Sequence, residues 1–481
     1  MKKNLTFPHK IFLVAFILRL VPVLLTSSLG IGLDDMFQYD TLARSLSSGN
    51  GFRWYAYDDL KRLEPFIEFD LSSIDYDPER GLPTSFRAPL YPAFLALIYS
   101  VASTGAGRFF AARLVQVGIN ALMAPLTYWI SHQIYKDDEK ISIRASWVVA
   151  SYPLLLIYPI GLATENLFFV LVLAAFFFLL KIPDSERTTQ PTLLAGVFLA
   201  LAALTRSVIL PFAGLALLWV GFVLKQKRNA VYMLMTISIL IAPWIIRNSL
   251  LHKRLTGIDT SMGYNLYLGY HPASDGSFTF GASLDLLSIM DDAERDQTGI
   301  ELALKFIRAD PKRIWPLALN RLGFFFGLEK RALVYFYSNN LLGYIPLPLL
   351  LVVTIIFLVP FIALSTSAVL GTAFTRFSKK TVLLYLLLLI YILPHIFILA
   401  EDRFHLTIIP FLALFAAKAW TDGIPTFKRR WQETFVGKIV LILTILIIFL
   451  LLANWSWELF RDWDKISILL GPEGNQSHFT Y

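Results

Sequence analysis

Carboxylate side chains stand at two places in this chain of 481 residues where proton-transfer chemistry is conceivable. Asp34 and Asp35 begin a segment that follows the first apolar run, and Glu165 lies in a short turn between two later apolar runs. A carboxylate held at such a place can take a proton from an attacking hydroxyl as a general base. The alternative is structural, because aspartate commonly caps a helix and glutamate favours the positive end of a helix. The residue types alone leave both interpretations open.

Arginine residues stand near the ends of other apolar runs. Arg87, Arg206 and Arg403 are placed so that, in a membrane, their guanidinium groups would meet the phosphate of a lipid. Anchoring to ordinary phospholipids is the alternative for each of them. Arg247, near the end of its run, is expected to extend its side chain toward the membrane surface.

Motifs that would indicate other chemistry are missing from the sequence. The absence of cysteine excludes disulfides, thiolate metal sites and cysteine nucleophiles. We find no P-loop, no dinucleotide-binding glycine pattern and no His-Glu-x-x-His zinc motif. With seven histidines, a dedicated metal cage is not expected, although carboxylates could hold a divalent cation. The sequence therefore predicts no cofactor other than such a cation, and it does not define the metal ligands.

The composition indicates a membrane protein. Hydrophobic residues make up 56% of the chain and charged residues 16%, whereas soluble domains contain about 25% charged residues. The mean hydropathy of +0.59 is too high for a chain of this length to bury in soluble cores. The net charge of +8 comes from short basic clusters between apolar runs, which is typical of membrane topology and not of a nucleic-acid groove. We expect no nucleic-acid partner.

The apolar runs predict an all-α integral membrane protein. A helix needs about 20 apolar residues to cross a bilayer. A shorter run, 89–103, is predicted to be a re-entrant or interfacial helix. The tail after Trp457 is predicted to be an interfacial anchor. About eleven runs are long enough to span, near 11–29, 109–135, 141–160, 166–182, 192–206, 208–224, 230–250, 341–365, 382–400, 405–420 and 438–456.

The basic clusters orient these spans. Lys and Arg gather in cytoplasmic loops, and alternation of the predicted spans places every cluster on that side. The same topology leaves 30–88 and 251–340 as long extracytoplasmic loops, and loops of this length usually carry function. Both acidic positions then face the extracytoplasmic side. The basic clusters lie near 2–10, 136–144, 225–228, 376–380 and 428–430.

An amphipathic helix along the outer membrane surface is predicted over 33–46. Its apolar face is formed by Met36, Tyr39, Ala43 and Leu46, which recur at helical spacing. The acidic pair would stand in its first turn.

Several short motifs follow one another along the chain: Asp35-x3-Tyr39, Arg87-Ala88-Pro89-Leu90-Tyr91-Pro92, Ala163-Thr164-Glu165, Leu204-Thr205-Arg206, Pro243-Trp244-x2-Arg247-Asn248, Asn265-Leu266-Tyr267-Leu268-Gly269 and Arg403-Phe404-His405-Leu406. In order and loop placement this series resembles the polytopic C-type (GT-C) glycosyltransferases. It is most similar to the bacterial relatives of protein O-mannosyltransferases and of aminoarabinose transferase. The resemblance covers most of residues 10–420.

For the fold, the resemblance implies a GT-C-type bundle of about 11–13 transmembrane helices, in which a large first extracytoplasmic loop carries interfacial helices. Residues 1–420 would form the transferase module, and 421–481 would form the last transmembrane helix and a C-terminal tail. The protein would reside in the cell membrane as a multi-pass protein, with its active site on the extracytoplasmic side.

For the activity, the resemblance implies transfer of a hexosyl or pentosyl group from a polyprenyl-phosphate carrier, with inversion at the anomeric carbon. The acceptor would be a lipid, a glycan or a protein. By position, Asp35 matches the family's catalytic aspartate, here the general base, and Glu165 matches its second acidic position. Asp34 is the neighbouring alternative for the base.

The resemblance also suggests which residues bind the substrates. Positional candidates for the donor phosphate are Arg87, Arg206 and Arg403. Membrane lipids are expected as further partners. The expected substrate contacts are Tyr39, Tyr91, Asn265 and Tyr267.

Two other classes of protein remain as alternatives. A secondary transporter would also have many spans, but it usually shows two related halves and places its charges near the bilayer midplane. A surface polysaccharide polymerase or ligase would be expected to depend on basic and histidine residues of a late external loop, such as His271. The effects of Asp35→Asn and His271→Ala on activity would separate a polymerase or ligase from the GT-C interpretation.

Overall fold

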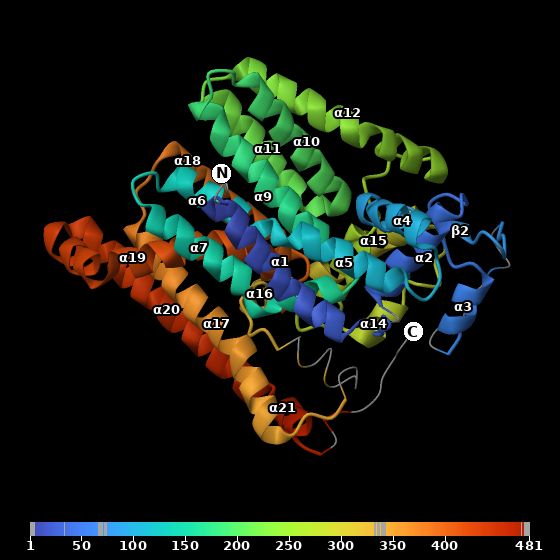
Figure 1. Ribbon diagram of the computed structural model, residues 1–481. Coiled ribbons are helices and arrows are strands. Elements are labelled where there is room, and N and C mark those ends of the chain that lie inside the picture. Colours follow the sequence, from blue (N-terminus) through green and yellow to red (C-terminus); the bar gives the residue numbers. More distant parts are fainter. Residues whose placement is uncertain are drawn as a thin grey trace.

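The structure, a computed structural model, describes residues 5–475 except 33, 66–70, 72–74, 331–332, 334–336, 338–342 and 473. Helices make up nearly all of the regular structure in these residues (Figure 1). The strands among them are β1 (Arg53–Trp54) and β2 (Leu82–Pro83), which pair antiparallel with Arg53 opposite Pro83. The predicted all-α class is confirmed.

Eight helices in the described part of the chain are long and apolar enough to cross a bilayer. Each coincides with a predicted run, so the protein is a multi-pass membrane protein. The eight are α1 (Phe7–Leu25), α5 (Arg108–Ala121) continued by α6 (Met123–Ile134), α9 (Glu165–Lys181), α12 (Lys227–His252), α17 (Leu347–Phe374), α18 (Lys379–Phe397), η7 (Asp402–Ile408) continued by α19 (Ile409–Glu433), and α20 (Phe435–Arg461).

The remaining predicted runs form bent or shorter helices. α7 (Glu139–Ser151) meets α8 (Pro153–Ile157) at an angle of 53°, because Pro153 cannot continue the hydrogen-bond ladder of α7. The runs 192–206 and 208–224 become two short helices. These helices and their short neighbours are η1 (Tyr158–Ile160), η2 (Ile182–Asp184), α10 (Thr189–Thr205), η3 (Ser207–Ile209), α11 (Leu210–Leu218) and η4 (Trp219–Val223).

α9 lies inside the bundle, where it packs against α6 and α10 (Figure 1). It is apolar on all sides, and Phe168, Phe169 and Phe176 are buried. A helix with this pattern belongs in the interior. α17 and α20 instead expose many leucine and isoleucine side chains, as expected of helices that face lipid.

Short helices gather at one end of the bundle, which we call the loop end. There α2 (Asp35–Ser47) packs against α4 (Leu90–Ala102), which is the short helix predicted over 89–103. Tyr39 and Ala43 of α2 are buried in this contact, with Met36 and Leu46 beside them, so the predicted apolar face is confirmed. The other short helices are α3 (Tyr57–Leu63), α13 (Met262–Tyr270), α14 (Phe280–Leu284), α15 (Asp292–Ala309), η5 (Pro311–Arg313), α16 (Ile314–Phe325) and, near the C-terminus, α21 (Trp463–Leu470).

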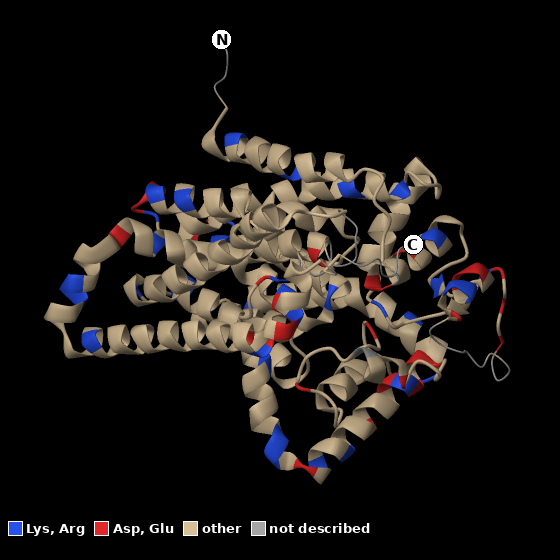
Figure 2. Ribbon diagram, turned by 90° about the horizontal axis from the view of Figure 1, so that it is seen from below, with Lys and Arg blue, Asp and Glu red and all other residues tan. Residues whose placement is uncertain are grey.

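Charges are distributed unevenly over the structure. Figure 2 shows many of the acidic residues toward the end that carries the short helices. Lys136 and Lys380 gather instead around Asp184, at the far ends of α6 and α9. The two ends of the bundle therefore differ in their charged residues (Figure 2), and the side of the membrane that each end faces stays a prediction.

Arg247 connects α12 to the first long loop. Its Nη1 donates a hydrogen bond to the carbonyl of Thr84 at 2.5 Å, and its Nη2 donates to the carbonyl of Phe52 at 3.3 Å. The guanidinium also lies 4.9 Å from the ring of Trp244. Carbonyl groups of the first long loop therefore satisfy Arg247, and its extension toward the membrane surface stays a prediction.

Candidate active site

The first turn of α2 separates two neighbouring aspartates. Asp34 precedes the helix, and its Oδ1 accepts a hydrogen bond from the backbone N–H of Met36 at 2.9 Å, which is an N-cap contact. Asp35 instead pairs with Arg87 through Oδ1 and with Arg403 through Oδ2, the latter at 3.3 Å. Asp35 is therefore the member of the pair that faces possible phosphate ligands.

Arg87 is held by charge and by aromatic faces. Besides its ion pair with Asp35, its Nε donates a hydrogen bond to Oε1 of Gln38 at 2.8 Å. The guanidinium carbon lies 5.3 Å from the ring centre of Tyr39 and 5.0 Å from that of Phe86. Burial disfavours the charge of Arg87, but Asp35, Tyr39 and Tyr264 together outweigh burial and raise the pKa of Arg87 above its usual value. The side chain thus remains a cation.

The second acidic position forms a buried ion pair. Glu165 is the first residue of α9, and only 4% of it is exposed. Its Oε1 lies 2.5 Å from Nη1 of Arg206, the residue that follows α10. The same Nη1 donates a hydrogen bond to Oγ1 of Thr164 at 3.3 Å. Because removing two charges from water is costly, a buried pair of this kind marks a candidate functional site.

Arg403 joins the two acidic positions. It lies in η7, and in addition to Asp35 it pairs through Nε with Glu401 at 2.8 Å. It also interacts electrostatically with Glu165. The structure therefore brings the predicted acids and arginines together in one place. We call this group the carboxylate–arginine cluster; its members are Asp35, Glu165, Glu401, Arg87, Arg206 and Arg403.

Tyr39 lies between the two ion pairs of the cluster. It interacts electrostatically with both Asp35 and Glu165. Burial raises the pKa of Tyr39, so its hydroxyl stays protonated and can act as a hydrogen-bond donor. The structure thus places this predicted substrate contact next to the candidate base.

Tyr91 supports Tyr39 from the side of α4. The two rings meet edge to face with their centres 5.2 Å apart. The hydroxyl of Tyr91 donates to Oε1 of Gln116 at 2.6 Å, and Nε2 of Gln116 donates to the carbonyls of Pro159 and Gly161. This chain of contacts orders the turn that leads to α9. Tyr91 is fully buried, so it positions its neighbours.

α13 carries the other two predicted substrate contacts. The hydroxyl of Tyr267 donates to Oδ2 of Asp285 at 2.7 Å, and its ring packs against Phe306, so Tyr267 is engaged within the second long loop. Asn265 is half-buried on the same helix. The α13 residue that does approach the cluster is Tyr264, which interacts electrostatically with Asp35 and Arg87.

Some residues of the site were not identified from the sequence, namely Gln38, Glu401 and Tyr264. Gln38 stands three residues after Asp35, which is the spacing that puts two side chains on one helix face. Glu401 stands two residues before Arg403. For Tyr264, no local pattern distinguishes it from the other tyrosines of α13.

The second long loop fixes the segment that carries Arg87. Oδ2 of Asp292, the first residue of α15, accepts hydrogen bonds from Oγ1 of Thr84 at 2.6 Å and from the backbone N–H of Ser85 at 2.8 Å. Arg295 neutralises the other carboxylate oxygen at 3.0 Å. Asp292 is 2% exposed. The position of Arg87 therefore depends on a buried contact between the two loops.

The carboxylates of the cluster are engaged by arginines. Among the residues described, no group of three or more histidine, aspartate or glutamate side chains could hold a metal ion. Asp35, Glu165 and Glu401 each face a guanidinium group. A divalent cation at this site stays a prediction.

Comparisons with known proteins agree on the fold. No family model matches the chain, and no curated protein matches it in sequence. Among solved structures, an oligosaccharyltransferase from Archaeoglobus fulgidus tethered with an acceptor peptide matches with a TM-score of 0.50, at 14% identity over 100% of this chain and 56% of that chain.

Two further structures are similar. The oligosaccharyltransferase AglB from Archaeoglobus fulgidus, in complex with an inhibitory peptide and a dolichol-phosphate, has a TM-score of 0.49, at 13% identity over 99% of this chain and 61% of that chain. ArnT from Cupriavidus metallidurans bound to undecaprenyl phosphate has a TM-score of 0.40, at 10% identity over 88% of this chain and 80% of that chain.

The chain therefore shares the overall fold of the oligosaccharyltransferase tethered with an acceptor peptide, and the predicted class, an all-α integral membrane protein, is confirmed. The chain spans about three fifths of the length of the archaeal oligosaccharyltransferases that it matches. At these identities the likeness concerns the fold, and function has to be argued from the site.

Proposed function

We propose that this protein transfers a hexosyl or pentosyl group from a polyprenyl-phosphate carrier to a lipid, glycan or protein acceptor on the extracytoplasmic face, with inversion at the anomeric carbon. The observation that carries the proposal is the position of Asp35 between Arg87 and Arg403. A candidate base and two candidate phosphate ligands thereby lie within one ion-pair network. The GT-C fold supports this class of reaction.

The proposed reaction is a single displacement. Asp35 takes the proton of the acceptor hydroxyl while its oxygen attacks C1 of the sugar. The bond between C1 and the phosphate oxygen breaks, and the lipid phosphate leaves as an anion. Arg87 and Arg403 stabilise the charge that develops on it. Glu165 holds Arg206, the third phosphate candidate, in place beside them.

The charge balance of the cluster suggests an order of events. In the structure both oxygens of Asp35 are occupied by guanidinium groups, which makes the carboxylate a weak base. A phosphate offers Arg87 and Arg403 a stronger, bidentate partner. Donor binding would then release Asp35 from its ion pairs, so the base would become active only when the donor is in place.

The test is donor turnover by the purified full-length protein in lipid nanodiscs. The protein is incubated with a panel of synthetic polyprenyl-phosphate sugars and candidate acceptors, and released polyprenyl phosphate is measured. NMR of the product gives its anomeric configuration, which we expect to be inverted. A product with retained configuration would contradict the displacement by Asp35. If no donor binds or reacts, the proposed function is wrong and the transporter alternative takes its place.

A further inference from the structure

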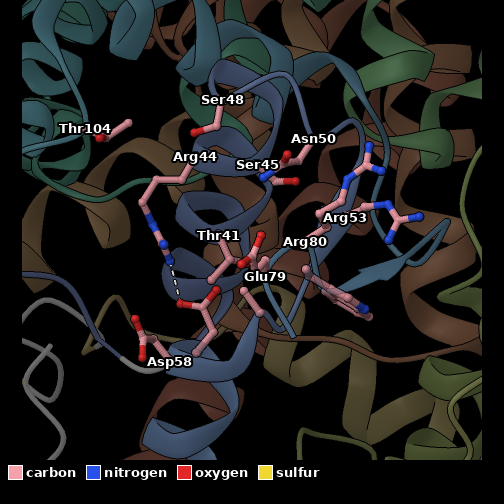
Figure 3. Close-up of a pocket in the computed structure, with 13 residues that line it drawn as sticks. Thr41, Arg44, Ser45, Ser48, Asn50, Arg53, Asp58, Glu79, Arg80 and Thr104 are labelled. Carbon is pink, nitrogen blue, oxygen red and sulfur yellow. Dashed lines mark hydrogen bonds and ion pairs between the residues drawn. The ribbon is translucent and has the colours of Figure 1, made fainter. Parts of the chain in front are cut away.

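A polar pocket lies in the first long loop, apart from the carboxylate–arginine cluster. Its volume is about 270 Å3, and Figure 3 shows side chains from the last turns of α2 and from the segments after it pointing toward the same space. This volume is close to the lower end of the range for small-molecule sites, which is about 300 Å3. The residues that line it are Thr41, Arg44, Ser45, Ser48, Asn50, Arg53, Trp54, Ala56, Asp58, Asp59, Glu79, Arg80 and Thr104.

One ion pair in the wall of this pocket is structural. Nη2 of Arg44 lies 2.6 Å from Oδ1 of Asp59, and Nε of Arg44 lies 2.9 Å from Oδ2 of the fully buried Asp40. Arg108 neutralises the other oxygen of Asp40 at 2.8 Å. These contacts hold α2 to the loop behind it. They give the pocket a rigid wall, because buried ion pairs with several partners fix side-chain positions.

Several other polar side chains in the wall of the pocket have no hydrogen-bond or ion-pair partner within the described part of the protein. Within the described parts of the chain, the side chains of Asn50, Asp58, Glu79 and Arg80 make no hydrogen bond or ion pair. Arg53 uses Nη1 to donate to the carbonyl of Gly81 at 2.7 Å. The pocket therefore offers donors and acceptors to a ligand without the need to break existing contacts.

The charges of this wall select against an ionic ligand. Arg53 and Arg80 face the pocket together with Asp58 and Glu79, so an anion and a cation would each meet a charge of its own sign. A neutral molecule with several hydroxyl groups can use the donors and the acceptors at once. We infer that this pocket binds a neutral saccharide, through Asn50, Asp58, Glu79 and Arg80.

The pocket is separate from the carboxylate–arginine cluster but shares a helix with it. Asp35 is the first residue of α2 and Arg44 lies in its last turn. A rise of 1.5 Å per residue places their backbones about 14 Å apart. The bound sugar is therefore not the one that reacts. We assign the bound saccharide to the acceptor, as a sugar unit some distance from the reacting hydroxyl. This assignment rests on the proposed function.

The test is saturation-transfer NMR on the full-length protein in nanodiscs. The probes are the neutral oligosaccharides maltotriose, mannotriose and diacetylchitobiose, with glucose 6-phosphate and glucosamine as charged controls. At least one neutral probe should bind, and better than either charged control. The double variant Asn50→Ala/Glu79→Ala should weaken that binding about tenfold or more, because it loses two ligand hydrogen bonds. Glu64→Ala, an exposed glutamate outside the pocket, should bind as the wild type does.

Binding in the Asp35→Asn variant separates this inference from the proposed function. If that variant binds the saccharide as the wild type does, the pocket is an independent site, whatever the donor assay shows. The inference is overturned if no neutral probe binds, if a charged control binds better, if the double variant binds normally, or if Asp35→Asn abolishes binding. Both variants alter solvent-accessible polar groups, and an unchanged melting temperature confirms that each is folded.

Discussion

Asp34 and Asp35 are chemically identical neighbours with different surroundings. The residue before a helix turns its side chain back to the free backbone N–H groups, and Asp34 does so. The next residue turns its side chain outward from the first turn, where Asp35 meets two guanidinium groups. The difference in proposed role therefore follows from one step along the helix.

Arg87 is expected to need its guanidinium shape and not only its charge. Arg87→Lys keeps a cation but loses the fork that suits phosphate, so the affinity for undecaprenyl phosphate should fall about tenfold or more. Equilibrium binding to the purified protein measures this change. Arg62→Lys, at an exposed position of α3, is the matched control and should bind normally. Unchanged affinity of Arg87→Lys would remove Arg87 from the phosphate site.

The pH dependence of activity tests the assignment of Tyr39 as a donor. Burial raises the pKa of Tyr39 above its usual value of about 10, which means that the protonated form persists to higher pH than in water. Tyr39→Phe should therefore lower the rate without moving the alkaline limb of the pH–rate profile. A limb that disappears in this variant would show that Tyr39 itself ionises during turnover.

Among the structural elements, the long helices were predictable from the sequence, whereas the ion-pair partners at the site were not. Apolar runs such as that of α9 are set by local composition alone. The partners of Asp35 are 52 and 368 residues away along the chain, so their contacts depend on how the whole bundle packs. Sequence motifs could name Asp35, Glu165 and the arginines as candidates, but not their pairing.

The choice among the tyrosines of α13 shows the same limit. Tyr264 approaches the cluster, whereas the predicted contact Tyr267 binds Asp285. Both residues belong to a helix that is largely buried and carries no clear polar face. Without an amphipathic pattern the sequence does not tell which side of such a helix meets a site.

The contact between the two long loops should control Arg87 indirectly. Asp292→Asn places an amide NH2 against the N–H of Ser85 and the O–H of Thr84, and it leaves Arg295 without a charged partner. Loss of a buried pair costs about 3 kcal/mol or more, so the melting temperature should fall.

Donor turnover gives the second readout for this contact. In Asp292→Asn the KM for the donor should rise more than kcat falls, since Arg87 is displaced while Asp35 stays in α2. Glu294→Gln is the control, because Glu294 lies exposed in the same first turn of α15 and its side chain is not part of the contact between the loops. Equal losses in both variants would show that Asp292 has no special role.

Across the whole molecule, extracytoplasmic transfer requires opposite ends of the bundle to face opposite sides of the membrane. The chain has no cysteine, so single cysteines can report on this directly. Glu64→Cys at the loop end should react with a membrane-impermeant maleimide added outside intact cells. Asp137→Cys, beside the basic cluster after α6, should react only after permeabilisation. The reverse pattern would place the carboxylate–arginine cluster in the cytoplasm and contradict the proposed extracytoplasmic transfer.

The most direct measurement compares donor turnover by Asp35→Asn and Asp34→Asn. Both variants make the same chemical change at adjacent positions, and asparagine preserves the cap that Asp34 provides. Asp35→Asn should lower the rate of polyprenyl phosphate release by about 10²- to 10⁴-fold, as expected for loss of a general base, while Asp34→Asn should stay close to wild type. Equal rates in the two variants, or a larger loss at Asp34, would contradict the assignment of Asp35 as the base.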